Sequence, residues 1–113
     1  MKLVVSVVDG FHGRPAGGVG VSVVSSAGND THTGESRGVT DENGEFRYKS
    51  GIESSAVAER FEIELDVDAY FSALGIVSFY RKVGASCRVF EPASDYRMVA
   101  VITPFMQATL SAH

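Results

Sequence analysis

Residues 61–75 read FEIELDVDAYFSALG, and this stretch joins a strand pattern directly to a helix pattern. Its first half alternates apolar residues with acidic ones, as in a strand that has one buried and one solvated face. The apolar positions of that strand are Phe61, Ile63, Leu65 and Val67. In the second half Asp68 is expected to cap a short helix and Gly75 to end it. The apolar residues between them, at helical spacing, are Tyr70, Phe71 and Leu74.

Strand patterns dominate the rest of the chain. The adjacent pair Asn43-Gly44, within TDENGEF, predicts a two-residue hairpin, because both residue types tolerate positive φ. Seven to eight short strands with one short helix, at turn spacings of roughly 8–12 residues, predict an all-β sandwich. The further strands are expected at Leu3–Asp9, Gly18–Ser25, Cys87–Phe90, Tyr96–Thr103 and Phe105–Ser111.

Composition narrows the class of protein. A chain of 113 residues is expected to form one domain, residues 1–113. The formal charge of −4 argues against nucleic acid as a partner, because phosphate binding needs a clustered basic surface. The apolar runs are shorter than a membrane span, and the N-terminal residues are expected to form a strand, not a secretory signal. Cys87 is the only cysteine, which favours a reducing compartment, and we expect a cytoplasmic protein.

Four segments together resemble the transthyretin / 5-hydroxyisourate hydrolase family. Residues 7–24, VVDGFHGRPAGGVGVSVV, resemble its opening strand–turn–strand, and residues 38–46, GVTDENGEF, resemble its central hairpin. Residues 61–90 resemble its strand, short helix with an Ala-Leu-Gly end, and next strand. Residues 95–105, DYRMVAVITPF, resemble its penultimate strand and the proline that follows. The similarity covers essentially the whole chain in order.

The resemblance implies a transthyretin-like β-sandwich protomer, a dimer made through edge strands, and a homotetramer of two such dimers. The tetramer of this family encloses a central channel with two equivalent ligand sites. Hydrolase members open the ring of 5-hydroxyisourate in urate breakdown, whereas carrier members bind an apolar aromatic hormone in the same channel.

The catalytic positions implied by the resemblance are all substituted here. The hydrolases use two histidines, an arginine and a C-terminal Tyr-Arg-Gly-Ser. The histidine positions hold Ser6 and Arg97, and the arginine position holds Glu45. The last four positions hold Leu110, Ser111, Ala112 and His113. Because a histidine is suited to proton transfer near neutral pH and an arginine stays charged, 5-hydroxyisourate hydrolysis of the classical kind is not expected.

The substituted positions remain the candidate site. We expect Arg97 and Glu45 to form a polar pair at the mouth of the channel, although solvated residues at strand ends are an equally simple interpretation. The candidate catalytic residues are Ser6, Glu45, Arg97 and His113. Strand alternation predicts that an aliphatic wall accompanies them. The ligand-binding candidates are Ser6, Val8, Glu45, Arg97, Val99, Val101, Ala108 and Leu110.

No cofactor or metal is expected, because His12, His32 and His113 lack the close spacing of metal ligands. Three functions stay open. The first is a site in the channel that binds or converts a small, largely apolar cyclic molecule. The second is a 5-hydroxyisourate hydrolase with an altered site. The third is an interaction or structural protein whose channel is closed by its own side chains.

Overall fold

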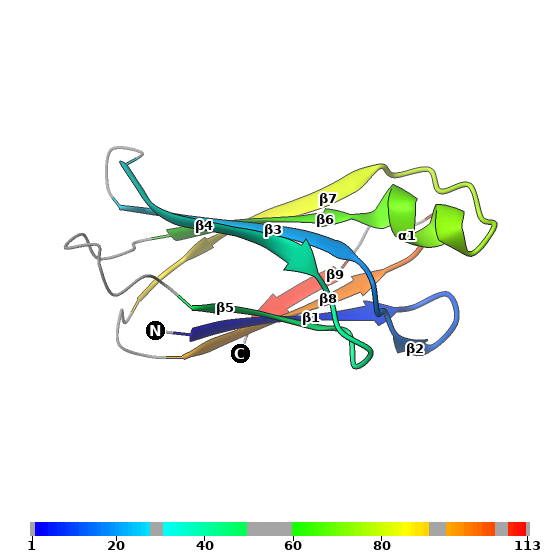
Figure 1. Cartoon of the computed structure of the whole chain (residues 1–113), viewed down its shortest axis with the longest axis horizontal. Helices are drawn as coiled ribbons and strands as arrows, with labels where there is room; N and C mark the ends of the chain where they lie inside the picture. The colour runs from blue at the N-terminus through cyan, green and yellow to red at the C-terminus, as the bar shows by residue number, and fades with distance from the viewer. Residues whose placement is uncertain (1, 28–30, 50–59, 91–94, 106–108, 113) are drawn as a thin grey trace.

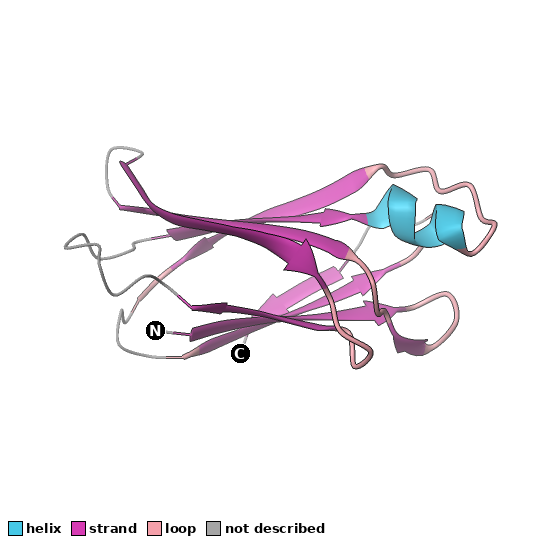
Figure 2. Cartoon of the chain, viewed as in Figure 1, coloured by secondary structure: helices cyan, strands magenta, loops and turns pink. Residues whose placement is uncertain are grey.

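The computed structural model describes residues 2–27, 31–49, 60–90, 95–105 and 109–112. They form two facing β-sheets with one short helix at an end of the sandwich (Figure 1, Figure 2). The first sheet contains β1 (Lys2–Asp9), β2 (Arg14–Pro15), β5 (Glu45–Lys49), β8 (Tyr96–Ile102) and β9 (Thr109–Ala112). The second sheet has the order β4-β3-β6-β7, with β3 (Gly20–Ala27), β4 (Thr31–Val39), β6 (Arg60–Asp66) and β7 (Lys82–Arg88). The predicted all-β sandwich with one short helix is confirmed.

Strand β1 holds the first sheet together. It pairs in parallel with β8 and antiparallel with β5, and its end pairs with the short strand β2. Alternate side chains of β1 point inward, and the buried ones are Leu3, Val5, Val7 and Asp9. The intervening residues, Val4, Ser6 and Val8, are half-buried on the opposite face. One strand therefore supplies both the core and the outer face of this sheet.

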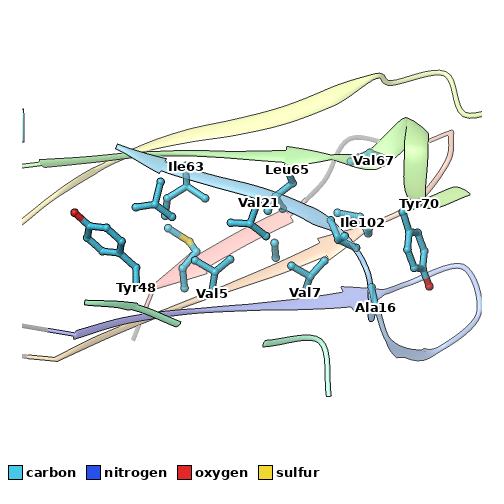
Figure 3. Close-up of a cluster of buried hydrophobic side chains, with 14 of the residues drawn as sticks. Val5, Val7, Ala16, Val21, Tyr48, Ile63, Leu65, Val67, Tyr70 and Ile102 are labelled. Carbon is cyan, nitrogen blue, oxygen red and sulfur yellow. The ribbon is translucent and has the colours of Figure 1, made fainter. Parts of the chain in front are cut away.

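The core lies between the two sheets (Figure 3). The inner face of β6 contributes Phe61, Ile63 and Leu65, as its alternating sequence predicts. Val5 and Val7 of the first sheet lie across from Ile63 and Leu65, as Figure 3 shows. Burying an aliphatic side chain of this size contributes on the order of 1.5–3 kcal/mol, so this layer is the main source of stability.

The helix forms where it was predicted, but its cap is a different residue. Helix α1 spans Val67–Ala73, and the carboxylate of Asp66 accepts from the backbone N–H of Ala69 at 3.0 Å. The prediction of Asp68 as the cap is wrong, because this residue already lies in the first helical turn and accepts from the hydroxyl of Ser78 at 3.1 Å. Gly75, with φ of +79°, follows the end of the helix as expected.

The turn at Asn43-Gly44 forms, but the predicted hairpin is wrong. Gly44 has φ of +76°, and its N–H donates to the carbonyl of Asp41 at 2.9 Å. The strands on either side belong to different sheets, because β4 pairs with β3 whereas β5 pairs with β1. The turn therefore carries the chain from one layer of the sandwich to the other.

Two strands differ most from the sequence prediction. Strand β7 spans Lys82–Arg88, whereas the sequence predicted a strand at Cys87–Phe90. Strand β4 was not predicted, because it contains Gly34 and Gly38 and has few apolar residues. Gly38 is needed for packing, since a Cβ there would lie 2.7 Å from the ring of Phe46. Among the described residues no helix is long and apolar enough to span a bilayer.

Gly44 also allows a close approach between β1 and the turn. A Cβ at Gly44 would collide with the carbonyl oxygen of Val7 and lie 3.1 Å from the backbone nitrogen of Ala16. Gly13 has a similar φ, +69°, but a Cβ there would meet no atom within 4 Å. Comparing substitutions at the two glycines therefore distinguishes the cost of the positive φ from the cost of the steric collision.

We expect Gly44→Ala to destabilise the protein more than Gly13→Ala. The positive φ alone costs an alanine about 1–2 kcal/mol at either position. The collision with Val7 at position 44 should add about 1–3 kcal/mol. Urea unfolding of the two variants measures the difference, and equal losses of unfolding free energy would contradict the close approach.

Candidate functional site

The candidate site lies on the outer face of the first sheet. The register places Ser6 between Glu45 on β5 and Val99 on β8. Arg97 pairs with Val4, two residues before Ser6 in β1. Since buried Val5 and Met98 are also opposite each other, the alternation directs Ser6 and Arg97 away from the core.

A network of hydrogen bonds joins these residues. Arg97 Nη1 donates to Ser6 Oγ at 2.7 Å and to Glu45 Oε2 at 2.8 Å. Arg47, two residues beyond Glu45, donates from Nη2 to Glu45 Oε1 at 3.0 Å. The expected Arg97–Glu45 pair is confirmed, and Ser6 is bonded to the same guanidinium nitrogen. We call Ser6, Glu45, Arg47 and Arg97 the outer cluster.

Sequence reasoning missed Arg47. It occupies the same face of β5 as Glu45, because residues two apart in a strand point the same way. That spacing was visible in the sequence and is the signal that would have identified it. The hairpin expected at Asn43-Gly44 would have paired β5 with β4, whereas β5 pairs with β1.

The outer cluster has an excess of positive charge. Two guanidinium groups share one carboxylate, which gives a formal charge of +1. The side chain of Glu45 is 19% exposed, whereas that of Arg97 is 46% exposed. Among the described residues Arg97 donates only from Nη1, so Nε and Nη2 have no partner there. The cluster is therefore suited to hold an acceptor oxygen or an anionic group.

Among the described residues, the outer cluster lacks the free base that a proton-transfer site needs. Ser6 Oγ accepts from Arg97, and no imidazole of the described residues contacts it. Both carboxylate oxygens of Glu45 are already bonded to arginine. A serine needs an adjacent base to act as a nucleophile, so the arrangement is better suited to binding than to base-assisted hydrolysis.

An aliphatic wall extends from the outer cluster across the same face. Its members are half-buried within the protomer: Val4, Val8, Val99 and Val101. The outer face of the second sheet differs, because it carries charged pairs such as Lys82–Glu64 at 3.3 Å. The outer face of the first sheet is therefore lined by valines beside the outer cluster, where that of the second sheet carries charged pairs.

The last strand, β9, pairs antiparallel with β8. In this pairing Leu110 is opposite Ala100, and Ser111 is opposite Val99. The role of Leu110 as a ligand-binding residue stays a prediction, because the structure describes the backbone of this strand and not its side chains. Ala108 and His113, which were also candidates, lie outside the described residues.

A second polar cluster lies at the end of β1, on the inner side. The buried carboxylate of Asp9 accepts from the backbone N–H groups of Phe11 at 2.9 Å and His12 at 2.8 Å. It also accepts from the Tyr70 hydroxyl at 2.7 Å and lies 2.6 Å from His12 Nδ1. We call Asp9, His12 and Tyr70 the Asp9 cluster. It fastens the β1–β2 loop to helix α1.

The Asp9 cluster shifts the titration of its own members. Burial alone would raise the pKa of Asp9, but hydrogen bonds from the His12 backbone, Tyr70 and the His12 ring outweigh it, and the pKa is lowered. Burial and the bond to the Asp9 carboxylate raise the pKa of Tyr70, and Arg14 partly opposes this effect. The carboxylate is therefore the ionised member of the pair.

The remaining candidates do not assemble into a site. Within the described ranges, no three His, Cys, Asp or Glu residues are arranged to hold a metal ion. Cys87 is half-buried, and burial, together with the nearby charge of Glu62, raises the pKa of its thiol. A raised pKa keeps the thiol protonated and poorly nucleophilic.

Comparison with known proteins places this geometry in context. A sequence profile described as the HIUase/Transthyretin family matches residues 3–110. Transthyretin from Sparus aurata superposes with a TM-score of 0.81 at 26% identity, covering 98% of this chain and 95% of that one. Sea bream transthyretin in complex with thyroxine gives 0.80 at 26% identity, covering 98% and 93%. (S)-Allantoin synthase gives 0.83 at 17% identity, and the match covers 98% of this chain but 42% of that one, so this likeness concerns the fold alone.

A double-mutant cycle on Arg97→Ala and Glu45→Ala should give a coupling energy below about 1 kcal/mol, because the pair is partly exposed to water. Unfolding free energies of the two single variants and the double variant in urea supply the cycle. A coupling of about 3 kcal/mol or more would instead identify the pair as a buried structural bridge.

Asp9→Asn should destabilise the protein by about 1–3 kcal/mol at neutral pH. The NH2 group that replaces one carboxylate oxygen would face hydrogen-bond donors and could not accept from them. The folded pKa of Asp9 is lowered, so its stabilising effect is complete above the unfolded value of about 3.9 and disappears as pH falls through the folded value. Urea unfolding of both proteins over this acid range should show the difference shrinking. A difference independent of pH would contradict the role of the ionised carboxylate.

Proposed function

This chain belongs to the HIUase/transthyretin family, and on that basis we propose that it binds a small, largely apolar cyclic molecule on the outer face of the first sheet. In this proposal the site is completed by further copies of the chain, which form a homotetramer around a central channel. The observation that carries the proposal is the position of Arg97, held by Ser6 and Glu45 at one end of an aliphatic wall.

The chemistry of the face defines the ligand. Val8, Val99 and Val101 offer a flat apolar surface, which favours a planar ring over a flexible polar chain. The unused guanidinium N–H groups of Arg97 favour a ligand with a carbonyl, carboxylate or phenolate at one end. A small-ligand complex has a precedent among the related structures, since sea bream transthyretin was solved with thyroxine.

Assembly follows from the contrast between the two outer faces. Half-buried valines on the first sheet would lose further contact with water if another copy covered them, at about 25 cal/mol per Å². The charged outer face of the second sheet offers no such gain, because its glutamates and lysines are already solvated. We therefore place the channel against the first sheet.

Conversion of the bound molecule is the second candidate function, and the Arg97–Ser6 contact favours it. A fixed guanidinium stabilises the oxyanion that develops when water attacks a cyclic acyl group. Without an imidazole beside Ser6, this step would rely on the electrostatic effect alone. The expected rate enhancement for 5-hydroxyisourate is accordingly small.

The binding proposal is tested with 8-anilinonaphthalene-1-sulfonate, a ring compound with one anionic group. We expect saturable fluorescence enhancement with two probe molecules per four chains. Arg97→Ala should weaken binding about tenfold, because it removes a charge-assisted hydrogen bond worth about 1.4 kcal/mol. Arg47→Ala is the matched control: it removes the same charge from the more exposed arginine and should weaken binding by about threefold or less.

Two results would overturn the binding proposal. One is an absence of saturable binding by a protein that is folded and tetrameric, which would favour a closed channel and a structural role. The other is equal binding by the Arg97→Ala variant and the unmodified protein. A separate absorbance assay on fresh 5-hydroxyisourate tests conversion, since a fast decay above the spontaneous rate would instead support the hydrolase.

A further inference from the structure

Glu45 lies between two guanidinium groups, and each of its carboxylate oxygens is bonded to one of them. Oε1 accepts from Arg47 Nη2 at 3.0 Å, and Oε2 accepts from Arg97 Nη1 at 2.8 Å. The strand register explains this arrangement, because Arg47 of β5 and Arg97 of β8 are both opposite Val4 of β1, on its two sides. One carboxylate therefore faces two cations.

The charge of Glu45 is only weakly screened by water. Its side chain is 19% exposed in the single chain, whereas that of Arg47 is 69% exposed. A second copy of the chain against this face would shield the carboxylate further. Because the interaction between charges strengthens as water is excluded, the Glu45 carboxylate acts on any charged group that approaches Arg97.

A ligand that binds Arg97 meets this carboxylate as well. The donors of Arg97 without a partner among the described residues, Nε and Nη2, belong to the same guanidinium that Glu45 contacts. An anion placed there is attracted by two guanidinium groups and repelled by one carboxylate. The first negative charge of a ligand balances the outer cluster, whereas a second would lose hydration without meeting an unbalanced cation.

We propose that Glu45 is the specificity-determining residue of this site and restricts its ligand to a ring compound with a single negative charge. The inference rests on the proposed function, because it concerns the same ligand on the outer face of the first sheet. Ser6 has a different role, since its neutral hydroxyl accepts from Arg97 at 2.7 Å and helps to hold it. The carboxylate holds Arg97 too, but it also sets the charge that the site accepts.

This restriction narrows the ligand class. A ring that carries one carboxylate or one phenolate fits the outer cluster, because its charge balances the excess of one guanidinium. A phosphate monoester fits poorly, because it carries a charge of about −1.5 to −2 at neutral pH. A neutral ring with a carbonyl group keeps the hydrogen bond to Arg97 and loses the attraction between charges.

Three probes with the same two rings and increasing charge test the inference: 2-naphthamide, 2-naphthoate and naphthalene-2,3-dicarboxylate. At about pH 8 they are neutral, singly charged and doubly charged, because this pH is well above the pKa of a carboxyl group. The two carboxylates of the third probe are adjacent, so both meet the same outer cluster. Isothermal titration calorimetry of the full chain at one fixed ionic strength should identify 2-naphthoate as the tightest ligand.

Glu45→Gln removes the charge and keeps the shape and one acceptor oxygen. Each negative charge of a probe should gain from this change. The affinity for 2-naphthamide should stay the same, that for 2-naphthoate should rise about threefold, and that for the dicarboxylate about tenfold. The matched control is Glu64→Gln, which removes the same charge from the Lys82–Glu64 pair on the outer face of the second sheet and should change none of the three affinities.

An equal change for all three probes in Glu45→Gln, with an intact fold by circular dichroism, would show that Glu45 only positions Arg97 and would overturn the inference. A dicarboxylate that binds the unmodified protein more tightly than 2-naphthoate, or the same effects in Glu64→Gln, would also overturn it. In these cases the probes still bind, so the proposed function stands. An absence of saturable binding of all three probes by the folded protein would overturn the proposed function together with the inference.

Discussion

The structure depends on the alternation of side chains along β1. Leu3, Val5 and Val7 build one half of the core, whereas Val4, Ser6 and Val8 build the middle of an outer face. Because β5 and β8 flank β1, their own alternation brings Glu45 and Arg97 to Ser6. A slip of one residue in the pairing with β5 would turn Glu45 toward the core, and a slip in the pairing with β8 would turn Arg97 toward it. The hydrophobic layer that sets the register therefore also builds the candidate site.

Two polar clusters use this strand in opposite ways. The outer cluster is partly solvated and contributes little to stability, and its value lies in holding a guanidinium in one place. The Asp9 cluster begins at a fully buried carboxylate, where every missing donor would leave an unsatisfied charge. The Asp9 carboxylate holds the backbone of the β1–β2 loop and orients the His12 ring.

The strands and the helix that depend on a local sequence pattern were predicted. The strands Leu3–Asp9 and Tyr96–Thr103, and the helix after residue 66, have strong periodicity and lie where they were expected. The Arg97–Glu45 pair was also predicted, because the family resemblance supplied the strand neighbours that spacing alone cannot give. The contact between His12 and Asp9 was not predicted, since nothing in the sequence shows that Asp9 is buried beneath this residue.

The wrong predictions share a physical cause. Pairing between distant segments cannot be read from any one short stretch of the sequence. The turn at Asn43-Gly44 has the right backbone chemistry for a hairpin, yet its flanking strands find better partners in separate sheets. Asp66 displaced Asp68 as the cap because β6 ends one residue before the helix begins.

The central claim is that copies of this chain enclose a ligand against the outer face of the first sheet. A crystal structure of the protein with 8-anilinonaphthalene-1-sulfonate measures this most directly. The account predicts four copies with these faces turned toward a shared channel and the sulfonate within hydrogen-bonding distance of Arg97. A face left open to solvent in every copy, or a probe bound only against the second sheet, would contradict it.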